Sequence, residues 1–219
     1  MRCTVIIVAA GRGVRAGGTV AKQFTPLEGG VVLMHTIDAF VSHCSDIVVV
    51  LPQGGLNFWK ELCLEHNFTT SHRVIEGSSE RFLSVHRGLA LVCDDTDVVL
   101  VHDGVRPFVS GEIIERVISA AAQSGAVVPV VPISDSLRRV GGGIVSRSEI
   151  MAVQTPQGFS LDILRRGYMQ PYNSCFTDDA SVVESAGYSI EMVEGDVRNF
   201  KITTPWDIEF AKYLSVKGQ

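Results

Sequence analysis

The sequence has few cysteines, and their placement excludes two common uses of the residue. Five cysteines are scattered along 219 residues, and none forms a C-x-x-C pair. A disulfide framework needs paired cysteines, and a structural zinc site needs closely spaced ligands. Neither is expected, and a reducing compartment such as the cytoplasm fits best. The cysteines are Cys3, Cys44, Cys63, Cys93 and Cys175.

Positive charge is also scarce. The chain has 19 Lys and Arg against 24 Asp and Glu, which gives a net charge of −5. Nucleic acids and anionic membrane surfaces favour a basic partner, because binding neutralises phosphates and releases counterions. We therefore expect neither a nucleic acid nor a membrane as a partner.

Long apolar runs are missing as well. No run approaches the roughly 20 residues that a membrane-spanning helix needs. The chain enters the apolar residues 3–9 at once and continues into Gly11-Arg12-Gly13. A signal peptide would have a basic start and a small-residue cleavage site. We interpret residues 3–9 as a first strand.

What the sequence does contain is a regular alternation of two patterns. Short runs rich in Val and Ile predict strands buried on both faces, and the stretches between them carry apolar residues three and four apart, as amphipathic helices do. Strand–helix alternation is typical of an α/β fold with a mostly parallel sheet, and residues 1–219 are expected to form a single domain. The strands are predicted at 3–9, 47–51, 98–101 and 126–131, and the helices at 32–42, 56–66, 80–92 and 111–124.

Helix start signals support this assignment. Ser79 is expected to cap the helix from residue 80, and Ser110 the helix from residue 111. Thr204-Pro205 followed by Asp207 predicts a last helix near the C-terminus, since it supplies a cap, a first-turn proline and an early acid.

One segment, residues 134–152, breaks the alternation. Two short polar and apolar runs flank Gly141-Gly142-Gly143, which predicts a β-hairpin. An isolated hairpin buries too little apolar surface to be stable. We expect this arm to lie on a second copy of the chain in a homodimer; the alternative is a hairpin folded back on its own domain.

A glycine-rich loop follows the first predicted strand: Ala9-Ala10-Gly11-Arg12-Gly13-Val14-Arg15-Ala16-Gly17-Gly18. It lacks the immediate helix and the later acidic residue of a dinucleotide-binding fingerprint, and Thr19 stands where a Walker motif needs Lys. What remains is a loop with Arg12, Arg15 and the following Lys22, whose charges suit a polyphosphate. The alternative is a solvated loop with nearby basic residues.

Five separated motifs carry a family resemblance. Together they resemble the 2-C-methyl-D-erythritol 4-phosphate cytidylyltransferases of the non-mevalonate isoprenoid pathway over nearly the whole chain, and ribitol-5-phosphate cytidylyltransferases share most of them. The motifs are the glycine loop with Lys22-Gln23-Phe24; Gly77-x-x-Glu80-Arg81-x-x-Ser84-Val85; His102-Asp103-Gly104-x-Arg106-Pro107; Thr155-Pro156-Gln157; and Thr177-Asp178-Asp179-Ala180 before Lys201-Ile202-Thr203-Thr204-Pro205.

The resemblance implies a Rossmann-like nucleotidyltransferase fold, a dimer built through the arm, and magnesium with CTP as the donor. It implies catalytic roles for Arg15 and Lys22 at the α-phosphate and the leaving group. It also implies that Asp103, Arg106, Thr155, Thr177 and Lys201 bind the polyol phosphate, with Ser136 and Arg147 from the partner's arm. The implied nucleotide-binding residues are Ala9, Ala10, Gly11, Gly13, Gly77, Ser78, Ser79 and Ser84.

The implied chemistry needs no protein base. A phosphate monoester has a second pKa near 6 and is largely dianionic at neutral pH, so it attacks the α-phosphorus of CTP unaided. No protein metal ligand is assigned, because the phosphates of CTP are expected to be the main ligands of Mg²⁺. Asp103 is interpreted as a partner of polyol hydroxyls or of the outer sphere of the ion.

Two positions depart from the family pattern. Ser78-Ser79 stand where Gly-Gly-Asp or a similar triplet is more common, and Ala21 stands where proline commonly precedes Lys-Gln. Other motif residues have structural interpretations. Glu80 with Arg81 could form a capping or salt-bridge pair, and His102 is expected to be a structural donor. Trp59 and Trp206 are expected to be packing residues.

Three rival functions stay open at this point. A ribitol-5-phosphate cytidylyltransferase would differ only in the acceptor skeleton. A non-catalytic nucleotide-binding regulator could keep the fold, although it would not need the cations Arg15, Lys22 and Lys201. A nucleotidyltransferase for sugar 1-phosphates would use another base.

Overall fold

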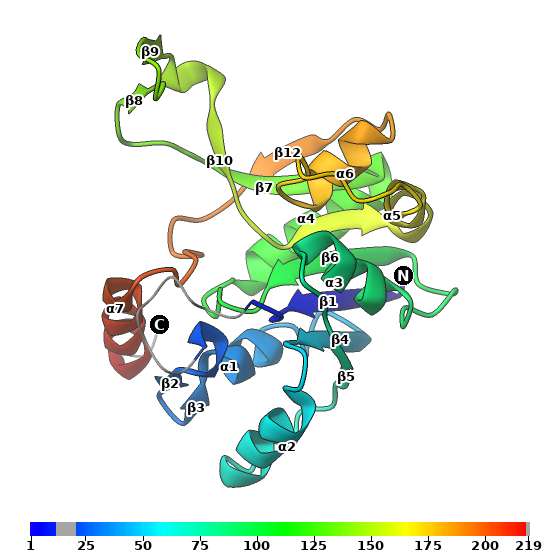
Figure 1. Cartoon of the computed structure of the whole chain (residues 1–219), viewed down its shortest axis with the longest axis vertical. Helices are drawn as coiled ribbons and strands as arrows, with labels where there is room; N and C mark the ends of the chain where they lie inside the picture. Colours follow the sequence, from blue (N-terminus) through cyan, green and yellow to red (C-terminus); the bar gives the residue numbers. More distant parts are fainter. Residues whose placement is uncertain (12–20, 218–219) are drawn as a thin grey trace.

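The computed structural model describes residues 1–11 and 21–217. Within this part of the chain, strands and helices alternate as the sequence predicts (Figure 1). The strands are β1 (Cys3–Val8), β2 (Pro26–Leu27), β3 (Gly30–Val31), β4 (Asp46–Leu51), β5 (Arg73–Glu76), β6 (Val98–Asp103), β7 (Ala126–Pro132), β8 (Leu137–Arg138), β9 (Ile144–Val145), β10 (Met151–Val153), β11 (Gln157–Ser160) and β12 (Glu191–Glu194). The helices are α1 (Val32–Asp38), α2 (Leu56–Glu65), α3 (Arg81–Leu89), α4 (Gly111–Ser124), α5 (Leu161–Tyr168), α6 (Asp179–Ser185) and α7 (Pro205–Lys217), with 3₁₀ turns η2 (Lys22–Phe24) and η3 (Arg147–Glu149).

The central sheet has eight strands among the described residues, in the order β10-β7-β11-β6-β1-β4-β5, with β12 paired to β7. The pairs β6–β1, β1–β4, β4–β5 and β12–β7 are parallel. The strand β11 runs antiparallel between β6 and β7, and β10 is antiparallel to β7. The expected mostly parallel α/β sheet is confirmed, with antiparallel strands added beside β6 and β7.

The two faces of the sheet bury different helices. Because neighbouring strand residues point to opposite faces, Val5 and Ile7 of β1 pack in one cluster with α1 and α4. Ile6, between them, packs in the other cluster with α3 and α5. The parallel strands are therefore covered on both sides, as their continuous apolar runs predict.

Most helix boundaries follow the predicted signals. Ser110 caps α4 by accepting a hydrogen bond from the Ile113 amide, and Gly125 ends the helix with φ +86°. The Thr204 hydroxyl accepts from the Asp207 amide at the start of α7. The expected cap at Ser79 is wrong. Glu80 is the extended residue before α3, and no side chain caps that helix.

The segment 134–152 forms the predicted hairpin, with β8 and β9 as its strands. The Gly142 amide donates to the Arg139 carbonyl oxygen across the glycine turn. The hairpin extends from the body at the top of Figure 1 rather than folding back on its own domain, and its Val140 and Ile144 are fully and 80% exposed, respectively. We call this segment the arm.

Two expectations about tryptophans have different outcomes. Trp59 of α2 is buried and donates its indole N–H to His72 Nε2, so its packing role is confirmed. Trp206 of α7 is 76% exposed, so the expectation that it is a packing residue is wrong. It lies at the second position of α7, on a side that the described body does not cover. None of the described helices is long and apolar enough to cross a membrane.

Candidate active site

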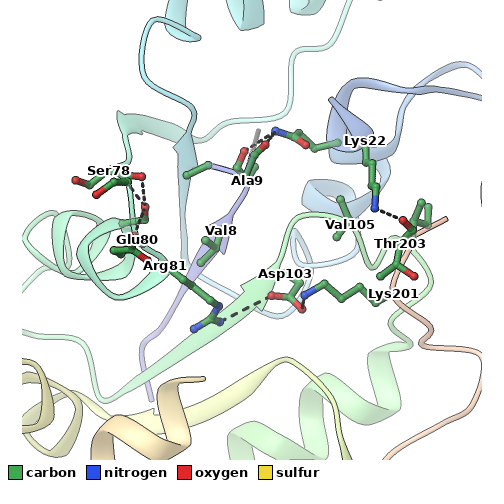
Figure 2. Close-up of a pocket in the computed structure, with 16 residues that line it drawn as sticks. Val8, Ala9, Lys22, Ser78, Glu80, Arg81, Asp103, Val105, Lys201 and Thr203 are labelled. Carbon is green, nitrogen blue, oxygen red and sulfur yellow. Dashed lines mark hydrogen bonds and ion pairs between the residues drawn. The ribbon is translucent and has the colours of Figure 1, made fainter. Parts of the chain in front are cut away.

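A cavity of about 360 Å³ opens at the carboxyl ends of β1 and β6, where open α/β sheets bind their ligands. It brings together segments that are far apart in the sequence (Figure 2). The lining residues are Val8, Ala9, Ala10, Gly11, Lys22, Gln23, Ser78, Ser79, Glu80, Arg81, Ser84, Asp103, Val105, Lys201, Ile202 and Thr203.

The start of the glycine loop is held in place by Gln23. Its side-chain amide donates to the carbonyl oxygens of Ala9 at 2.7 Å and Gly11 at 2.9 Å, and Gln23 itself is buried. One side chain thereby fixes the backbone of Ala9-Ala10-Gly11 at the cavity wall. Gln23 belongs to the Lys22-Gln23-Phe24 motif, but the motif alone does not reveal this role of its amide. Gly13 and Arg15, both predicted to act here, lie outside the described residues.

Lys22 lies in the cavity wall at the start of the turn η2. Its ammonium donates to the Thr203 carbonyl oxygen, which joins the N-terminal loop to the segment before α7 (Figure 2). A carbonyl is a neutral partner, so the charge of Lys22 is not cancelled by an acid there. The predicted cation therefore lies at the cavity.

The predicted nucleotide loop forms the opposite wall. The Ser84 hydroxyl accepts from the Ser78 amide at 3.0 Å and donates to the Glu80 carbonyl oxygen at 2.9 Å, so it ties the loop to the first turn of α3. Gly77 lies behind this wall. A Cβ at Gly77 would lie 2.5 Å from the Ala10 Cβ, so only glycine lets the two loops approach so closely.

Asp103, at the end of β6, is the centre of the charged floor. Its carboxylate lies 3.0 Å from Lys201 Nζ, 3.4 Å from Arg106 Nε and 3.8 Å from an Arg81 guanidinium nitrogen. Burial alone would raise the pKa of the carboxyl, but the three cations hold the pKa of Asp103 well below its ordinary value. Asp103 is therefore ionised at any physiological pH.

His102 and Thr155 fix the backbone at Asp103 from behind. The Thr155 hydroxyl accepts from the Asp103 amide at 3.0 Å and lies 3.1 Å from His102 Nδ1, while His102 Nε2 lies 3.1 Å from the Arg106 carbonyl oxygen. Burial lowers the pKa of His102 to about 4, so its ring is neutral near pH 7. Both ring nitrogens have protein partners, which agrees with the predicted structural role. Thr155 is buried and lies behind the cavity rather than in its lining.

Arg106 is likewise placed as a support. It is buried, and besides Asp103 it donates to the Asn199 carbonyl oxygen at 2.6 Å. It contacts Asp103 from outside the cavity lining. Among the residues predicted to bind the acceptor, Asp103 and Lys201 line the cavity itself.

Thr177 lies away from the cavity lining and is exposed. Its amide donates to the Ser181 hydroxyl at 3.1 Å, and the cap of α6 is Asp178, whose carboxylate accepts from the Ser181 amide. Asp178 therefore caps α6, and Thr177 is the residue before the cap.

The arm residues Ser136 and Arg147 are exposed and do not line the cavity of their own chain. The arm that carries them extends from the body (Figure 1). Arg147 donates to the Ser134 carbonyl oxygen at 2.6 Å, within the arm.

The partner of Arg81 could not be predicted from the sequence. The expected Glu80–Arg81 pair is wrong: Arg81 makes a two-pronged contact with Asp179 at 2.7 and 2.8 Å, and Glu80 accepts from the Tyr172 hydroxyl. Asp179 is 98 positions away, so no local pattern indicates the pair. The signal available was that both residues belong to the motifs of one family.

Comparisons with known proteins give one consistent result. The family model for 2-C-methyl-D-erythritol 4-phosphate cytidylyltransferase matches residues 3–216. The protein of that name from Bacteroides thetaiotaomicron is 47% identical over 98% of this chain and 100% of its own length. A relative from Bacillus velezensis is 39% identical over 98% of this chain and 96% of its own length. The crystal structure of the protein of that name from Thermus thermophilus superposes with a TM-score of 0.81 at 34% identity, covering 99% of this chain and 100% of that one.

Proposed function

This chain belongs to the 2-C-methyl-D-erythritol 4-phosphate cytidylyltransferase family, and from that premise we propose how its own residues join the CMP unit of CTP to 2-C-methyl-D-erythritol 4-phosphate. The enzyme is a cytidylyltransferase that releases pyrophosphate and forms 4-diphosphocytidyl-2-C-methyl-D-erythritol in non-mevalonate isoprenoid biosynthesis. The observation that carries the proposal is that one cavity is lined by the glycine-loop backbone, the Ser78–Ser79 loop, Lys22 and the Asp103–Lys201 pair. Residues 1–219 act as a single catalytic domain.

The reaction begins with the phosphate of the acceptor. One of its oxygens attacks the α-phosphorus of CTP in line with the leaving pyrophosphate, and no base is needed because the monoester is already largely dianionic. Negative charge gathers at the reacting phosphorus, so catalysis consists of positioning and electrostatic stabilisation. His102, with both ring nitrogens engaged, is not required to move a proton.

Lys22 and Arg15 are the proposed catalytic cations. Lys22 exchanges its neutral partner, the Thr203 carbonyl oxygen, for phosphate oxygens of CTP, which are stronger acceptors for an ammonium. Arg15 is assigned to the same phosphates through its motif. Gly13 is assigned to the nucleotide through the same motif.

The cytosine and ribose lie between the two loops of the cavity. Ala9, Ala10 and Gly11 supply backbone groups from one side, and the loop at Gly77, Ser78 and Ser79 supplies them from the other. Ser84 acts through the Ser78 amide that its hydroxyl accepts from, so it shapes the loop that reads the base.

The acceptor binds at the charged floor. Lys201 turns from Asp103 to the acceptor phosphate, and Asp103 accepts hydrogen bonds from polyol hydroxyls. Arg106 and Thr155 hold Asp103 in place through the 3.4 Å and 3.0 Å contacts described above. Thr177 is assigned to the phosphate by its motif.

Magnesium fits this donor set as a partner of the nucleotide. Mg²⁺ is usually held by one or two carboxylates together with substrate phosphates. The described residues contain no cluster of three or more potential metal-ligating side chains, and the cavity offers Glu80 and Asp103. We assign the ion to the phosphates of CTP, with Asp103 in its outer sphere. When bound, the ion would offset part of the negative charge of the triphosphate.

A homodimer completes the acceptor site. The arm exposes Ser136 and Arg147, which do not line the cavity of their own chain, and a guanidinium offers a forked donor to phosphate oxygens. We assign these two residues to the acceptor phosphate in the partner's cavity. The dimer works in the cytoplasm, where the scattered thiols stay reduced.

The proposal is tested by pyrophosphate release from CTP and Mg²⁺ with two acceptors, 2-C-methyl-D-erythritol 4-phosphate and ribitol 5-phosphate. We expect a higher kcat/KM with the methylerythritol compound. Faster turnover of ribitol 5-phosphate would overturn the acceptor assignment. Absence of pyrophosphate with either acceptor would overturn the transfer reaction and favour a nucleotide-binding regulator.

A further inference from the structure

Arg81 joins the two halves of the cavity. It is the first residue of α3, directly after the loop that reads the nucleotide, and its guanidinium reaches Asp179 at the start of α6. The same guanidinium lies 3.8 Å from Asp103 on the acceptor side. Figure 2 shows Asp103 between Arg81 on one side and Lys201 on the other.

Asp179 locks the orientation of Arg81. Its carboxylate is completely buried and accepts two N–H groups of Arg81 and the hydroxyl of Tyr168 at 2.7 Å. Such a forked contact fixes a planar guanidinium in direction as well as position. Burial alone would lower the pKa of Arg81, but the carboxylates beside it raise the pKa above its ordinary value, so the side chain stays charged.

The position of Arg81 matters when the acceptor arrives. In the structure Lys201 is the nearest cation to Asp103, at 3.0 Å, and the proposed function requires Lys201 to turn to the acceptor phosphate. A carboxylate whose side chain is 11% exposed would then lose its closest partner, which is costly for a buried charge. Arg81 cannot follow Lys201, because Asp179 holds it.

We propose that Arg81 is a positioning residue of the acceptor site, which anchors the Asp103 carboxylate so that Lys201 is free to bind the acceptor phosphate. This inference rests on the proposed function. Arg81 acts through Asp103, which contacts the polyol, and not through the nucleotide. A guanidinium serves best here, since one planar group satisfies Asp179 with two N–H groups and still faces Asp103.

The consequence is a separation of kinetic effects. We expect Arg81→Gln to raise KM for the polyol phosphate about tenfold and to lower kcat about tenfold, while KM for CTP changes less than about twofold. Arg81→Lys, which keeps the charge but loses the fork, should recover kcat/KM about tenfold over the glutamine variant. A general loss of structure would not separate the two substrates.

A double-mutant cycle tests whether Arg81 acts through Asp103. Asp103→Asn is expected to lower kcat/KM for the polyol phosphate about a hundredfold. The double variant with Arg81→Gln should have a kcat/KM less than about threefold below that of Asp103→Asn alone. The matched control is Arg73→Gln, which removes an Arg–Asp pair, with Asp46, at the opposite end of the sheet. It should leave both KM values within about twofold of wild type.

Steady-state pyrophosphate release and thermal unfolding are measured for all variants. Equal rises in both KM values, or additive losses in the cycle, would overturn the inference. If Arg81→Gln does not fold, Arg81→Lys decides alone: a rise in KM confined to the polyol phosphate supports the inference, and unchanged or equally raised KM values overturn it. A wild-type enzyme without pyrophosphate release would instead count against the proposed function.

Discussion

The cavity and the arm differ in where their polar side chains find partners. At the cavity, the Asp103 carboxylate lies near three cations, and the Gln23 side-chain amide donates to two carbonyl oxygens of the glycine loop. In the arm, the hydrogen bonds of residues 134–150 stay within the arm, as between Arg147 and the Ser134 carbonyl oxygen. Its apolar Val140 and Ile144 are exposed.

This difference separates a region whose polar groups are paired within one chain from a region whose surface is left exposed. A network whose members support one another is rigid before substrate binds, and such preorganisation is how enzymes stabilise charge during a reaction. The arm, by contrast, has surface that a single chain leaves in water. The predictions below test each region against the other, from the largest expected effect to the smallest.

Removing Lys22 should have the largest effect on the cavity. We expect Lys22→Ala to lower kcat by about 10²–10³-fold, as loss of an oriented transition-state donor does elsewhere. The side chain donates to one exposed carbonyl oxygen, so thermal stability should change little. Lys212→Ala, which removes an ammonium of α7 paired with Glu209, serves as the control. Near-normal turnover of Lys22→Ala would remove the residue from the mechanism.

The buried His102 should make the cavity region sensitive to acid. Its pKa is lowered from an ordinary value of about 6.5 to about 4, so between these values the unfolded chain binds a proton that the folded chain does not. The resulting stability, about 3 kcal/mol, is fully present above pH 6.5 and is lost as the pH falls through about 4. Asp103, whose pKa is also lowered, loses its contribution only below about pH 4.

Urea unfolding of wild type and His102→Gln between pH 7.5 and 4.5 checks this expectation. The free energy of unfolding of the variant should fall less steeply with acid than that of wild type. His86→Gln, at an exposed position of α3, should keep the wild-type slope. Parallel slopes for wild type and His102→Gln would show that this histidine does not titrate as described.

The contact between the glycine loop and the loop at Gly77 should be intolerant of a methyl group. A Cβ at Gly77 would lie 2.5 Å from the Ala10 Cβ and 2.8 Å from the Ser84 hydroxyl oxygen. We expect Gly77→Ala to destabilise the fold by about 2 kcal/mol, as overpacking does, and to weaken the binding of CTP. Isothermal titration with CTP and thermal unfolding measure both. Unchanged CTP affinity would mean that the loops separate without cost.

In the arm, the property of glycine that matters is its tolerance of a positive φ angle rather than its small size. Gly142 has open space around its Cβ position but a φ of +97°, so Gly142→Ala strains only the backbone, by about 1 kcal/mol. If the arm completes the partner's acceptor site, KM for the polyol phosphate should rise about fivefold. Gly141→Ala has neither the positive φ nor a neighbour within 4 Å and is the control. Equal KM values for the two variants would separate the arm from the acceptor.

The sequence predicts the fold best where local chemistry is strong. Continuous Val and Ile runs identify β1 and β4, and the Ser110 hydroxyl marks the start of α4. The strand β11, Gln157–Ser160, was missed because it is short and contains glycine and polar residues, and its burial between β6 and β7 comes from tertiary packing. Trp206 was misplaced because residue type alone does not say which side of α7 faces the body.

For the site, motif residues identify the cavity but not their partners. Asp103 and Lys201 meet as the family motifs imply, although 98 residues separate them. The assignment of Ser79 as a cap and of Glu80 to Arg81 was wrong, because both rested on sequence proximity while the structure turns Ser79 to the cavity and Arg81 to Asp179. Long-range pairing of charges is decided by the fold and has no local signature.

The most direct test of the division between cavity and arm mixes two inactive subunits. Lys22→Ala breaks the cavity, and Arg147→Ala breaks the proposed arm contribution; a mixed dimer would keep one intact site, built from the cavity of one subunit and the arm of the other. Random reassociation of equal amounts should restore about a quarter of wild-type activity. No recovery in dimers verified as mixed by mass, or full activity of Arg147→Ala alone, would contradict the account.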